Sequence, residues 1–423
     1  MSAPDVFLED TIVAAATPPG TGAIALLRLS GPDALPILER LLETPAHLRH
    51  GRARRLRVDG LDDFLVTPYL APRSYTGEDT VEISCHGNPL IVERFLLRLT
   101  AAGARAAGPG EFTYRAVRNG KMTVTEAERL AHRLHARLPW ELELAETGKP
   151  AAEAFSELLA QVHRAMADLE SAIEFQEGEG PDWEALADRI RRIAVAARLQ
   201  DHWARLPRVL LLGAVNAGKS TLFNRIAGYD RAIVSDQPGT TRDWLETEIR
   251  HEGILFQLID SAGLRPQAGG LQAADGPEAE GMRHTLELAR DADVIVAFSE
   301  APELVDDART IAVQGKADEA GSRLDGRLPV SGRTGAGVQE LLRRIVECVR
   351  TRRTAERPEW WFSVRLSVLA QELETAFGKL QAEPLAEVRA LHLQRLARRL
   401  EDQLEVPPAD LYGLIFSRFC IGK

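Results

Sequence analysis

Residues 208–228 read RVLLLGAVNAGKSTLFNRIAG, and this stretch decides the fold of the middle of the chain. The apolar run Val209 to Leu212 is typical of a short buried strand, and residues 221–228 are typical of a helix. Between them, residues 213–220 have the spacing GxxxxGKS, in which glycines let backbone N–H groups approach phosphate oxygens. A strand, a glycine-rich loop and a helix in this order predict a phosphate-binding P-loop.

The sequence on both sides of the P-loop changes its pattern several times. Residues 1–120 combine short β-like runs with turn signals and predict an α+β domain. Apolar residues recur at helical intervals in residues 121–206 and again in residues 352–423, whereas residues 207–351 alternate strands with helices. We therefore predict a multidomain α+β and α/β protein, in which a P-loop α/β domain is inserted into a discontinuous helical domain.

The composition of the 423 residues excludes several classes of protein. No run approaches the roughly 18 apolar residues of a membrane helix, and the first residues lack the basic and apolar regions of a secretory signal. We therefore expect a cytoplasmic protein that does not enter a membrane. The three cysteines are too few for a disulfide framework, and the net charge of -10 predicts that any RNA contact is local or shared with a partner.

Each residue type of the P-loop suits one part of a nucleotide triphosphate. Lys219 would neutralise the β- and γ-phosphates, and the hydroxyl of Ser220 would bind Mg²⁺. The following helix directs its positive N-terminal dipole at the same phosphates. P-loops also occur in ATPases and kinases, so the loop alone does not choose the base. The predicted nucleotide-binding residues here are Asn216, Ala217, Gly218, Lys219, Ser220 and Thr221.

Two further elements have the order expected of a GTPase. Asp260 follows the run LFQLI, which places a carboxylate at a strand end where it can hold Mg²⁺ through water. The Thr240-Thr241 pair precedes it in a polar loop, where Thr241 would complete the Mg²⁺ shell in a segment that the γ-phosphate orders. The predicted nucleotide-binding residues of this second element are Asp260, Ser261, Ala262 and Gly263.

Guanine selection is expected from an Asn-Lys-x-Asp element, and this sequence has Gly315, Lys316 and Asp318 in the corresponding places. Asp318 can still discriminate against adenine. We expect the missing asparagine to loosen the loop and to weaken binding by about 1–3 kcal/mol if a buried hydrogen bond is lost, unless a neighbour compensates. Ser331-Gly332-Arg333 fits the last base-contacting loop, although an ordinary turn explains this tripeptide equally well.

Motifs along the whole chain add to the P-loop. They are Asp10–Ala14, Ala16–Gly20, Leu29–Pro32, Pro72–Asp79, Cys85–Gly87, Gly108–Thr113, Asn119–Lys121 and the ending Phe419–Lys423. With the nucleotide motifs, this set resembles the MnmE (TrmE) family of tRNA modification GTPases. The resemblance implies a tetrahydrofolate-binding and dimerising domain over residues 1–120, a helical domain in two halves, and an inserted G domain over residues 207–351.

The resemblance also implies a function and its partners. Members of the family work as homodimers with the flavoprotein MnmG, in a heterotetramer, on C5 of the wobble uridine of certain tRNAs. The product is of the 5-carboxymethylaminomethyl type, and 5-formyl- or methylene-tetrahydrofolate supplies the one-carbon unit. By position, the folate-binding residues would be Arg28, Glu82, Lys121 and Lys423. Their charges suit the glutamate carboxylates and the pterin donor edge of a folate.

GTP hydrolysis in the family is activated by K⁺, which supplies positive charge where other GTPases use an arginine finger. The matching K⁺ ligands here are Asn216, Ser235, Gln237 and Thr240. The resemblance assigns catalytic roles to Lys219 and Thr241, and Glu278 would orient the attacking water, with Glu280 as a rival because the preceding segment is long.

Two alternatives remain open at this point. The departures from the family pattern cluster in the G domain, so the chain could be a diverged scaffold that binds nucleotide with weak or no turnover. It could also be a GTPase of ribosome or RNA assembly, because that class shares the P-loop and switch elements.

Overall fold

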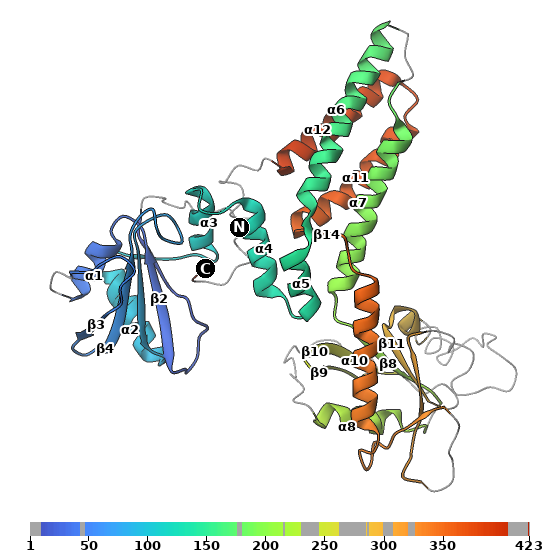
Figure 1. Cartoon of the computed structure of the whole chain (residues 1–423), viewed down its shortest axis with the longest axis horizontal. Helices are drawn as coiled ribbons and strands as arrows, with labels where there is room; N and C mark the ends of the chain where they lie inside the picture. Colours follow the sequence, from blue (N-terminus) through green and yellow to red (C-terminus); the bar gives the residue numbers. More distant parts are fainter. Residues whose placement is uncertain are drawn as a thin grey trace, which may run out of the picture. The chain divides into compact units, whose positions relative to one another are not determined.

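The computed structural model describes residues 10–42, 47–175, 180–214, 216–229, 245–261, 285, 287–298, 308–319, 326–404 and 422. The chain forms two compact units, which we describe separately (Figure 1). Unit 1 consists of Met1–His135, Lys149–Val195 and Trp360–Lys423. Unit 2 consists of Ala136–Gly148 and Ala196–Glu359.

Unit 1 begins with a six-stranded sheet in the order β3-β4-β5-β2-β1-β6. Its strands are β1 (Ile12–Ala15), β2 (Ile24–Ser30), β3 (Arg54–Val58), β4 (Asp62–Tyr69), β5 (Thr80–His86) and β6 (Arg105–Ala106). All neighbours are antiparallel except β1 and β6. The β2–β5 pairing sets Arg28 directly opposite Glu82.

The two faces of this sheet differ. Helices α1 (Ala34–Leu42) and α2 (Pro89–Ala101) pack on one face, where Leu27, Ile83 and Phe95 belong to the main buried core. On β2 and β5, side chains alternate between the faces, so Arg28 and Glu82 lie on the face away from α1 and α2. The register and the alternation together place two opposite charges side by side on the face opposite α1 and α2.

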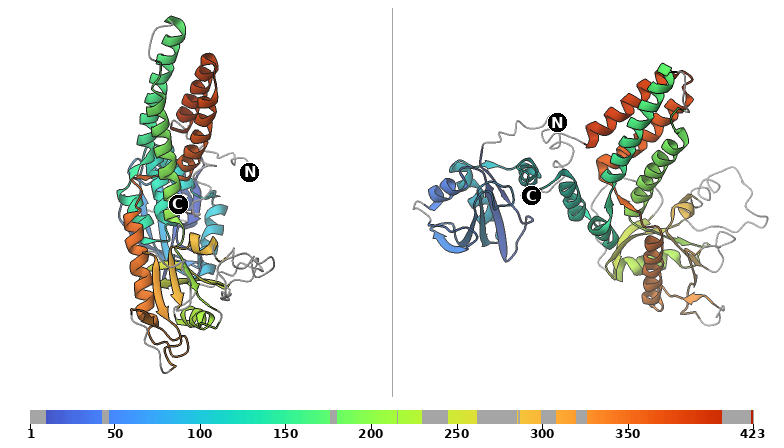
Figure 2. Two further views of the ribbon diagram at one scale, coloured as in Figure 1. Left: turned by 90° about the vertical axis from the view of Figure 1, so that its right-hand side faces the viewer. Right: turned by 45° about the horizontal axis from the view of Figure 1, so that its top comes forward.

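The rest of the described part of unit 1 is mainly helical. The helices are α3 (Glu111–Arg118), α4 (Val124–His135), α6 (Ala151–Phe175), most of α7 (Trp183–Ala204), α11 (Val364–Ala382) and α12 (Ala386–Leu404). The long helices α6 and α12 run alongside one another (Figures 1 and 2). Two short strands, β7 (Lys149–Pro150) and β14 (Trp360–Trp361), pair in parallel at the base of this helical part. None of the helices that the structure describes has both the length and the apolar composition needed to cross a bilayer.

Unit 2 is built around a second six-stranded sheet in the order β13-β12-β11-β8-β10-β9. Its strands are β8 (Arg208–Leu212), β9 (Leu245–His251), β10 (Ile254–Asp260), β11 (Val294–Phe298), β12 (Thr310–Gln314) and β13 (Leu328–Pro329). All pairs are parallel except β9 with β10. Helices α8 (Lys219–Tyr229) and α10 (Val338–Ala355) pack against the sheet (Figure 1). The carboxyl ends of parallel strands meet at one edge, which is where ligands of such sheets bind.

At the opposite edge of this sheet, a series of buried hydrogen bonds connects the sheet to the ends of helices. The indole of Trp140, in α5 (Pro139–Thr147), donates to the carbonyl of Trp203 at 3.1 Å, and the indole of Trp203 donates to the carbonyl of Arg353 at 2.7 Å. The Arg353 guanidinium in turn donates to Asp293 at 2.9 Å, just before β11. Because all of these groups are buried, α5, the end of α7, and α10 are held to the sheet within unit 2.

Candidate active site

The P-loop lies between β8 and α8, as its sequence predicts. Lys219 is buried, and its Nζ donates to the carbonyl oxygens of Gly213 and Ala214, both at 2.9 Å. Burial lowers the pKa of the Lys219 ammonium, and the charge of Asp260 opposes that shift. Asn216 and Gly218 have φ angles of 65° and 99°, so both residues adopt left-handed backbone conformations, which are common in anion-binding loops.

Asp260 ends β10 and is paired in register with Leu211 of β8. Its Oδ1 atom is buried and has no hydrogen-bond partner among the residues that the structure describes. A buried carboxylate oxygen without a partner fits a hydrated cation, since hard divalent ions prefer oxygen ligands. The neighbouring Ser261 uses its hydroxyl to donate to the Leu211 carbonyl at 2.6 Å, which fixes the end of β10 to β8.

The predicted base loop, residues 315–318, follows β12. Lys316 adopts a φ of 55°, and its side chain lies beside Gly218 of the P-loop. Asp318 accepts a hydrogen bond of 2.6 Å from the hydroxyl of Ser331, and this bond is the main reason that the pKa of Asp318 is lowered. Ser331 is fully buried and also accepts from the N–H of Thr334 at 3.1 Å. The structure therefore brings Lys316, Asp318 and Ser331 together with the P-loop.

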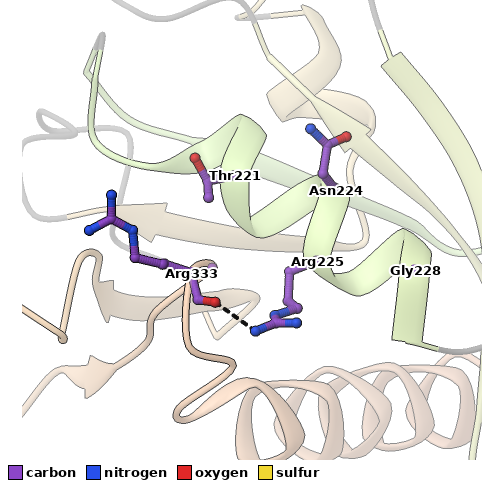
Figure 3. Close-up of a pocket in the computed structure, with 6 residues that line it drawn as sticks. Thr221, Asn224, Arg225, Gly228 and Arg333 are labelled. Atoms are coloured by element: carbon purple, nitrogen blue, oxygen red, sulfur yellow. Dashed lines mark hydrogen bonds between the residues drawn. The ribbon is translucent and has the colours of Figure 1, made fainter.

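The Ser331-Gly332-Arg333 loop packs tightly against α8. A Cβ atom added to Gly332 would lie 2.6 Å from the carbonyl carbon of Thr221, so this position accepts only glycine without a shift of the backbone. The guanidinium of Arg225 donates to the Arg333 carbonyl at 2.6 Å (Figure 3). A pocket of about 400 Å³ opens between this loop and the helix. It is lined by Thr221, Asn224, Arg225, Gly228, Gly332 and Arg333 (Figure 3).

Several predicted site residues lie outside the described part of the chain. They are Ser235, Gln237, Thr240, Thr241, Ala262, Gly263, Glu278 with its rival Glu280, and Lys423. Asn216, Ser220 and Thr221 are described and exposed at the surface of the loop and the start of α8. Among the described residues, no group of three or more His, Cys, Asp or Glu side chains could hold a metal ion.

A second constellation lies on the face of the unit 1 sheet that is opposite α1 and α2. Arg28 and Glu82 form an ion pair of 2.7 Å, with their side chains 16% and 22% exposed. The guanidinium of Arg28 lies over the rings of Tyr75 and Phe112, at 5.4 and 5.8 Å from the ring centres. The hydroxyls of Tyr75 and Thr113 are 2.8 Å apart. Charge, a carboxylate and two aromatic rings thus meet at one place.

The other predicted members of this constellation can be partly placed. The side chain of Lys121 is exposed and its stem packs beside Gly77, in the same loop as Tyr75. Gly422 is buried and lies so close to the Ala15 carbonyl that an added Cβ would overlap it. Ala15 ends β1, next to the residue that pairs with Arg28. The penultimate residue therefore reaches the N-terminal sheet.

Family models match both regions. The model described as "GTP-binding protein TrmE N-terminus" matches residues 11–121, and "50S ribosome-binding GTPase" matches residues 208–321. The tRNA modification GTPase MnmE of Thermotoga maritima is 33% identical over 465 residues, covering 98% of this chain and 100% of that protein. The chain belongs to the MnmE family. The MnmE of one strain of Thermus thermophilus is 35% identical over 446 residues, with 98% and 100% covered.

Membership of the MnmE family makes this chain a GTP hydrolase that uses Mg²⁺. Among solved structures, the G domain of the T. maritima FeoB iron transporter is 26% identical, covering 34% of this chain and 99% of its own, with a TM-score of 0.26. The predicted resemblance and the multidomain fold class are both confirmed.

The sequence prediction did not include two aromatic residues of the MnmE-family N-terminal domain, Tyr75 and Phe112. Both lie within motifs that carried the resemblance, Pro72–Asp79 and Gly108–Thr113, and this was the available signal. Burial raises the pKa of the Tyr75 hydroxyl, although its bond to Thr113 and the charge of Arg28 oppose that shift. Tyr75 thus keeps its proton at neutral pH and can act as a donor.

Proposed function

We propose that this MnmE-family GTPase is activated by K⁺ and acts with the flavoprotein MnmG in folate-dependent modification of C5 of the wobble uridine of tRNA. The observation that carries the proposal is the coexistence, in one chain, of the GTP site and the Arg28–Glu82–Tyr75–Phe112 constellation. The relatives that match the whole chain are named tRNA modification GTPases, which supports a tRNA as the final substrate. The homodimer, the MnmG complex and the 5-carboxymethylaminomethyl product follow from the family resemblance.

The nucleotide site supports specific roles for its residues. Lys219 would neutralise the β- and γ-phosphates, and its lowered pKa reflects a buried ammonium that gains from phosphate contact. Ser220 and Thr241 would bind Mg²⁺, with Asp260 accepting from a water in the ion's shell. Asn216, with Ser235, Gln237 and Thr240, would hold K⁺. When bound, the two cations supply positive charge that stabilises the transition state.

Hydrolysis also requires a residue that orients water and a loop that selects the base. Glu278 is proposed for the first role, and Lys316 with Asp318 for the second. Asp318 has its carboxylate fixed by the 2.6 Å bond from Ser331, so its acceptor oxygens are held in one direction. A guanine presents N1–H and N2–H donors to such a carboxylate, and adenine does not. The backbone of Ala262, Gly263 and Gly332 would complete the GTP site.

The N-terminal constellation supports tetrahydrofolate as its ligand. A pterin ring needs an aromatic neighbour and a carboxylate for its donor edge, and Tyr75, Phe112 and Glu82 offer both. Arg28 would contact the cofactor beside Glu82, to which it is ion-paired at 2.7 Å, and Lys121 and Lys423 would bind acidic groups of the cofactor. Gly422, the neighbour of Lys423 in the sequence, lies beside Ala15 of β1. When bound, 5-formyl- or methylene-tetrahydrofolate supplies the one-carbon unit.

The first experiment compares GTP turnover in KCl and NaCl at equal ionic strength. We expect turnover roughly tenfold or more faster in KCl, and loss of that stimulation in Asn216→Ala. Asn224→Ala is the matched control, because Asn224 is also an exposed asparagine but lies on α8 rather than in the P-loop. Equal turnover in the two salts would exclude K⁺ activation, and bound GTP without turnover would favour a nucleotide-binding scaffold.

The second experiment titrates 5-formyl-tetrahydrofolate into the intact protein by calorimetry. Binding is expected for the wild type and for Arg55→Ala, and not for Arg28→Ala. Arg55 is a suitable control because it also pairs across strands of the same sheet, with Asp63 at 2.8 Å, but is 75% exposed. Absence of heat with the wild type would count against a folate role and favour a GTPase of ribosome or RNA assembly.

A further inference from the structure

Phe298 occupies the centre of the nucleotide-binding edge of unit 2. It is the last residue of β11, which lies between β12 and β8 in the sheet. The loop after β8 is the P-loop, and the loop after β12 is the predicted base loop. Phe298 pairs in register with Val313 of β12, and its side chain is 2% exposed. A large buried ring therefore stands between the two loops that must hold the two ends of one nucleotide.

Phe298 contacts a glycine of each loop. A Cβ added to Gly213, at the start of the P-loop, would lie 2.7 Å from the Cβ of Phe298. A Cβ added to Gly315 would lie 2.9 Å from both Cδ1 and Cε1 of the Phe298 ring, and it would also overlap the carbonyl oxygen of Ala217 in the P-loop. Real Cβ atoms essentially never approach this closely, so neither glycine can gain a side chain without a shift of the structure.

These contacts bear on the prediction that the base loop is loosened because position 315 is a glycine instead of an asparagine. The sequence predicts a loosened base loop where Gly315 replaces asparagine, but the structure fills that space from two sides. The ring of Phe298 packs on one side of Gly315, and the backbone of Ala217 lies on the other. Lys316, the next residue, also places its side chain beside Gly218. The base loop therefore touches the P-loop directly through its backbone.

We propose that Phe298 and Gly315 act together as a substitute for the asparagine, and that Phe298 is a positioning residue for guanine recognition. Phe298 holds the base loop at a fixed distance from the P-loop, so that Asp318 meets the base while Lys219 meets the phosphates. Gly315 is required because any side chain would force the two loops apart. The inference rests on the proposed guanine site at Asp318, and it assigns the fit between the two loops to packing instead of a side-chain hydrogen bond.

The test measures competition of GTP and of ATP against a fluorescent GDP analogue bound to the intact protein. ATP shares the phosphate contacts but not the guanine contact, so the ratio of the two affinities isolates recognition of the base. Phe298→Ala is expected to lower the GTP-to-ATP ratio at least tenfold, about 1.4 kcal/mol, with a smaller change for Phe298→Leu. Phe256→Ala is the matched control, because Phe256 is a fully buried phenylalanine of β10 in the same sheet. It should lower the melting temperature and leave the ratio unchanged.

Gly315→Asn provides the sharper variant, because it restores the residue that the motif normally has. We expect it to weaken GTP binding at least tenfold, since the new side chain meets Phe298 and Ala217. Tighter or unchanged GTP binding by Gly315→Asn would overturn the proposal, as would an unchanged ratio in Phe298→Ala. A wild-type chain that does not prefer GTP would overturn the guanine site and this inference with it. A wild type that prefers GTP, with an unchanged ratio in Phe298→Ala, would overturn this inference alone.

Discussion

Replacement of Arg115 by methionine should destabilise the N-terminal sheet of unit 1 and the loop that carries Tyr75. The Arg115 side chain is 1% exposed and contacts three carboxylates, at 2.6 Å from Asp10, 3.1 Å from Glu111 and 3.2 Å from Glu78. Burial opposes the charge of the guanidinium, but these carboxylates outweigh it and raise the pKa of Arg115. Methionine would fill most of the volume and remove the positive charge.

The size of the destabilisation depends on the partners that the carboxylates keep when Arg115 is replaced. Glu111 is 1% exposed and keeps Arg105 at 2.6 Å, and Glu78 keeps the Ser30 hydroxyl at 2.7 Å. Removal of one partner from a buried ion pair costs about 3–5 kcal/mol, and the retained partners place this variant near the lower limit. A loss of about 3 kcal/mol corresponds to roughly 150-fold faster amide exchange where exchange requires opening of the sheet.

Hydrogen exchange measured by mass spectrometry on the intact protein is the suitable assay, because it reports on peptides from β2 and β5 separately from unit 2. Arg55→Met is the control, since the Arg55–Asp63 pair lies in the same sheet but is exposed, and such pairs contribute only about 0–1 kcal/mol. If β5 of Arg115→Met exchanged no faster than β5 of Arg55→Met, the buried charge network would have no part in the stability of this domain.

Three further predictions concern charge and close packing. Burial alone would raise the pKa of the Asp10 carboxyl. The hydrogen bonds that Asp10 accepts from Arg105 and Arg115 outweigh burial, so its pKa lies below the usual 3.8. The charged Asp10 therefore stabilises the folded state fully above pH 3.8, and this stabilisation is lost as the pH falls through the lower folded-state pKa. In Asp10→Asn, the free energy of unfolding should depend less on pH below about pH 4 than in the wild type, as measured by acid denaturation. Gly332→Ala should weaken GDP binding at least tenfold in a fluorescence titration, because its methyl group would lie 2.6 Å from the Thr221 carbonyl carbon; unchanged binding would show that the loop can move. Asp318→Asn should prefer XTP over GTP, because the new amide donates a hydrogen bond where the carboxylate accepted one. If competition assays showed that this variant still prefers GTP, base recognition would depend on other residues.

The sequence predicted those parts of the fold that depend on local pattern. The apolar run Val209 to Leu212 forms β8, and the helical spacing predicted for residues 121–206 is seen in α6. The P-loop was equally accessible, because glycine spacing and the lysine lie within eight residues of one another. These features need no knowledge of which segments meet in space, so a single sequence is sufficient for them.

The N-terminal constellation depends on contacts between distant segments, and the sequence alone could not define it. Arg28 and Glu82 are separated by 54 positions and meet only through the antiparallel register of β2 and β5. Tyr75 and Phe112 come from two other segments and complete the site through packing on Arg28. The family resemblance supplied Arg28 and Glu82, whereas the aromatic residues required the structure.

Strand β11 has the nucleotide loops at its carboxyl end and the buried hydrogen bonds of Arg353 and Asp293 at its amino end. At its carboxyl end, Phe298 packs against Gly213 and Gly315, one glycine from each nucleotide loop. At its amino end, Asp293 accepts from the Arg353 guanidinium at 2.9 Å and from the Arg208 N–H at 2.9 Å. Because β11 is paired on both sides by parallel neighbours, its two ends keep a fixed separation. The five residues of β11 therefore connect the packing of the two nucleotide loops to the buried hydrogen bonds that hold α5, the end of α7, and α10, all within unit 2.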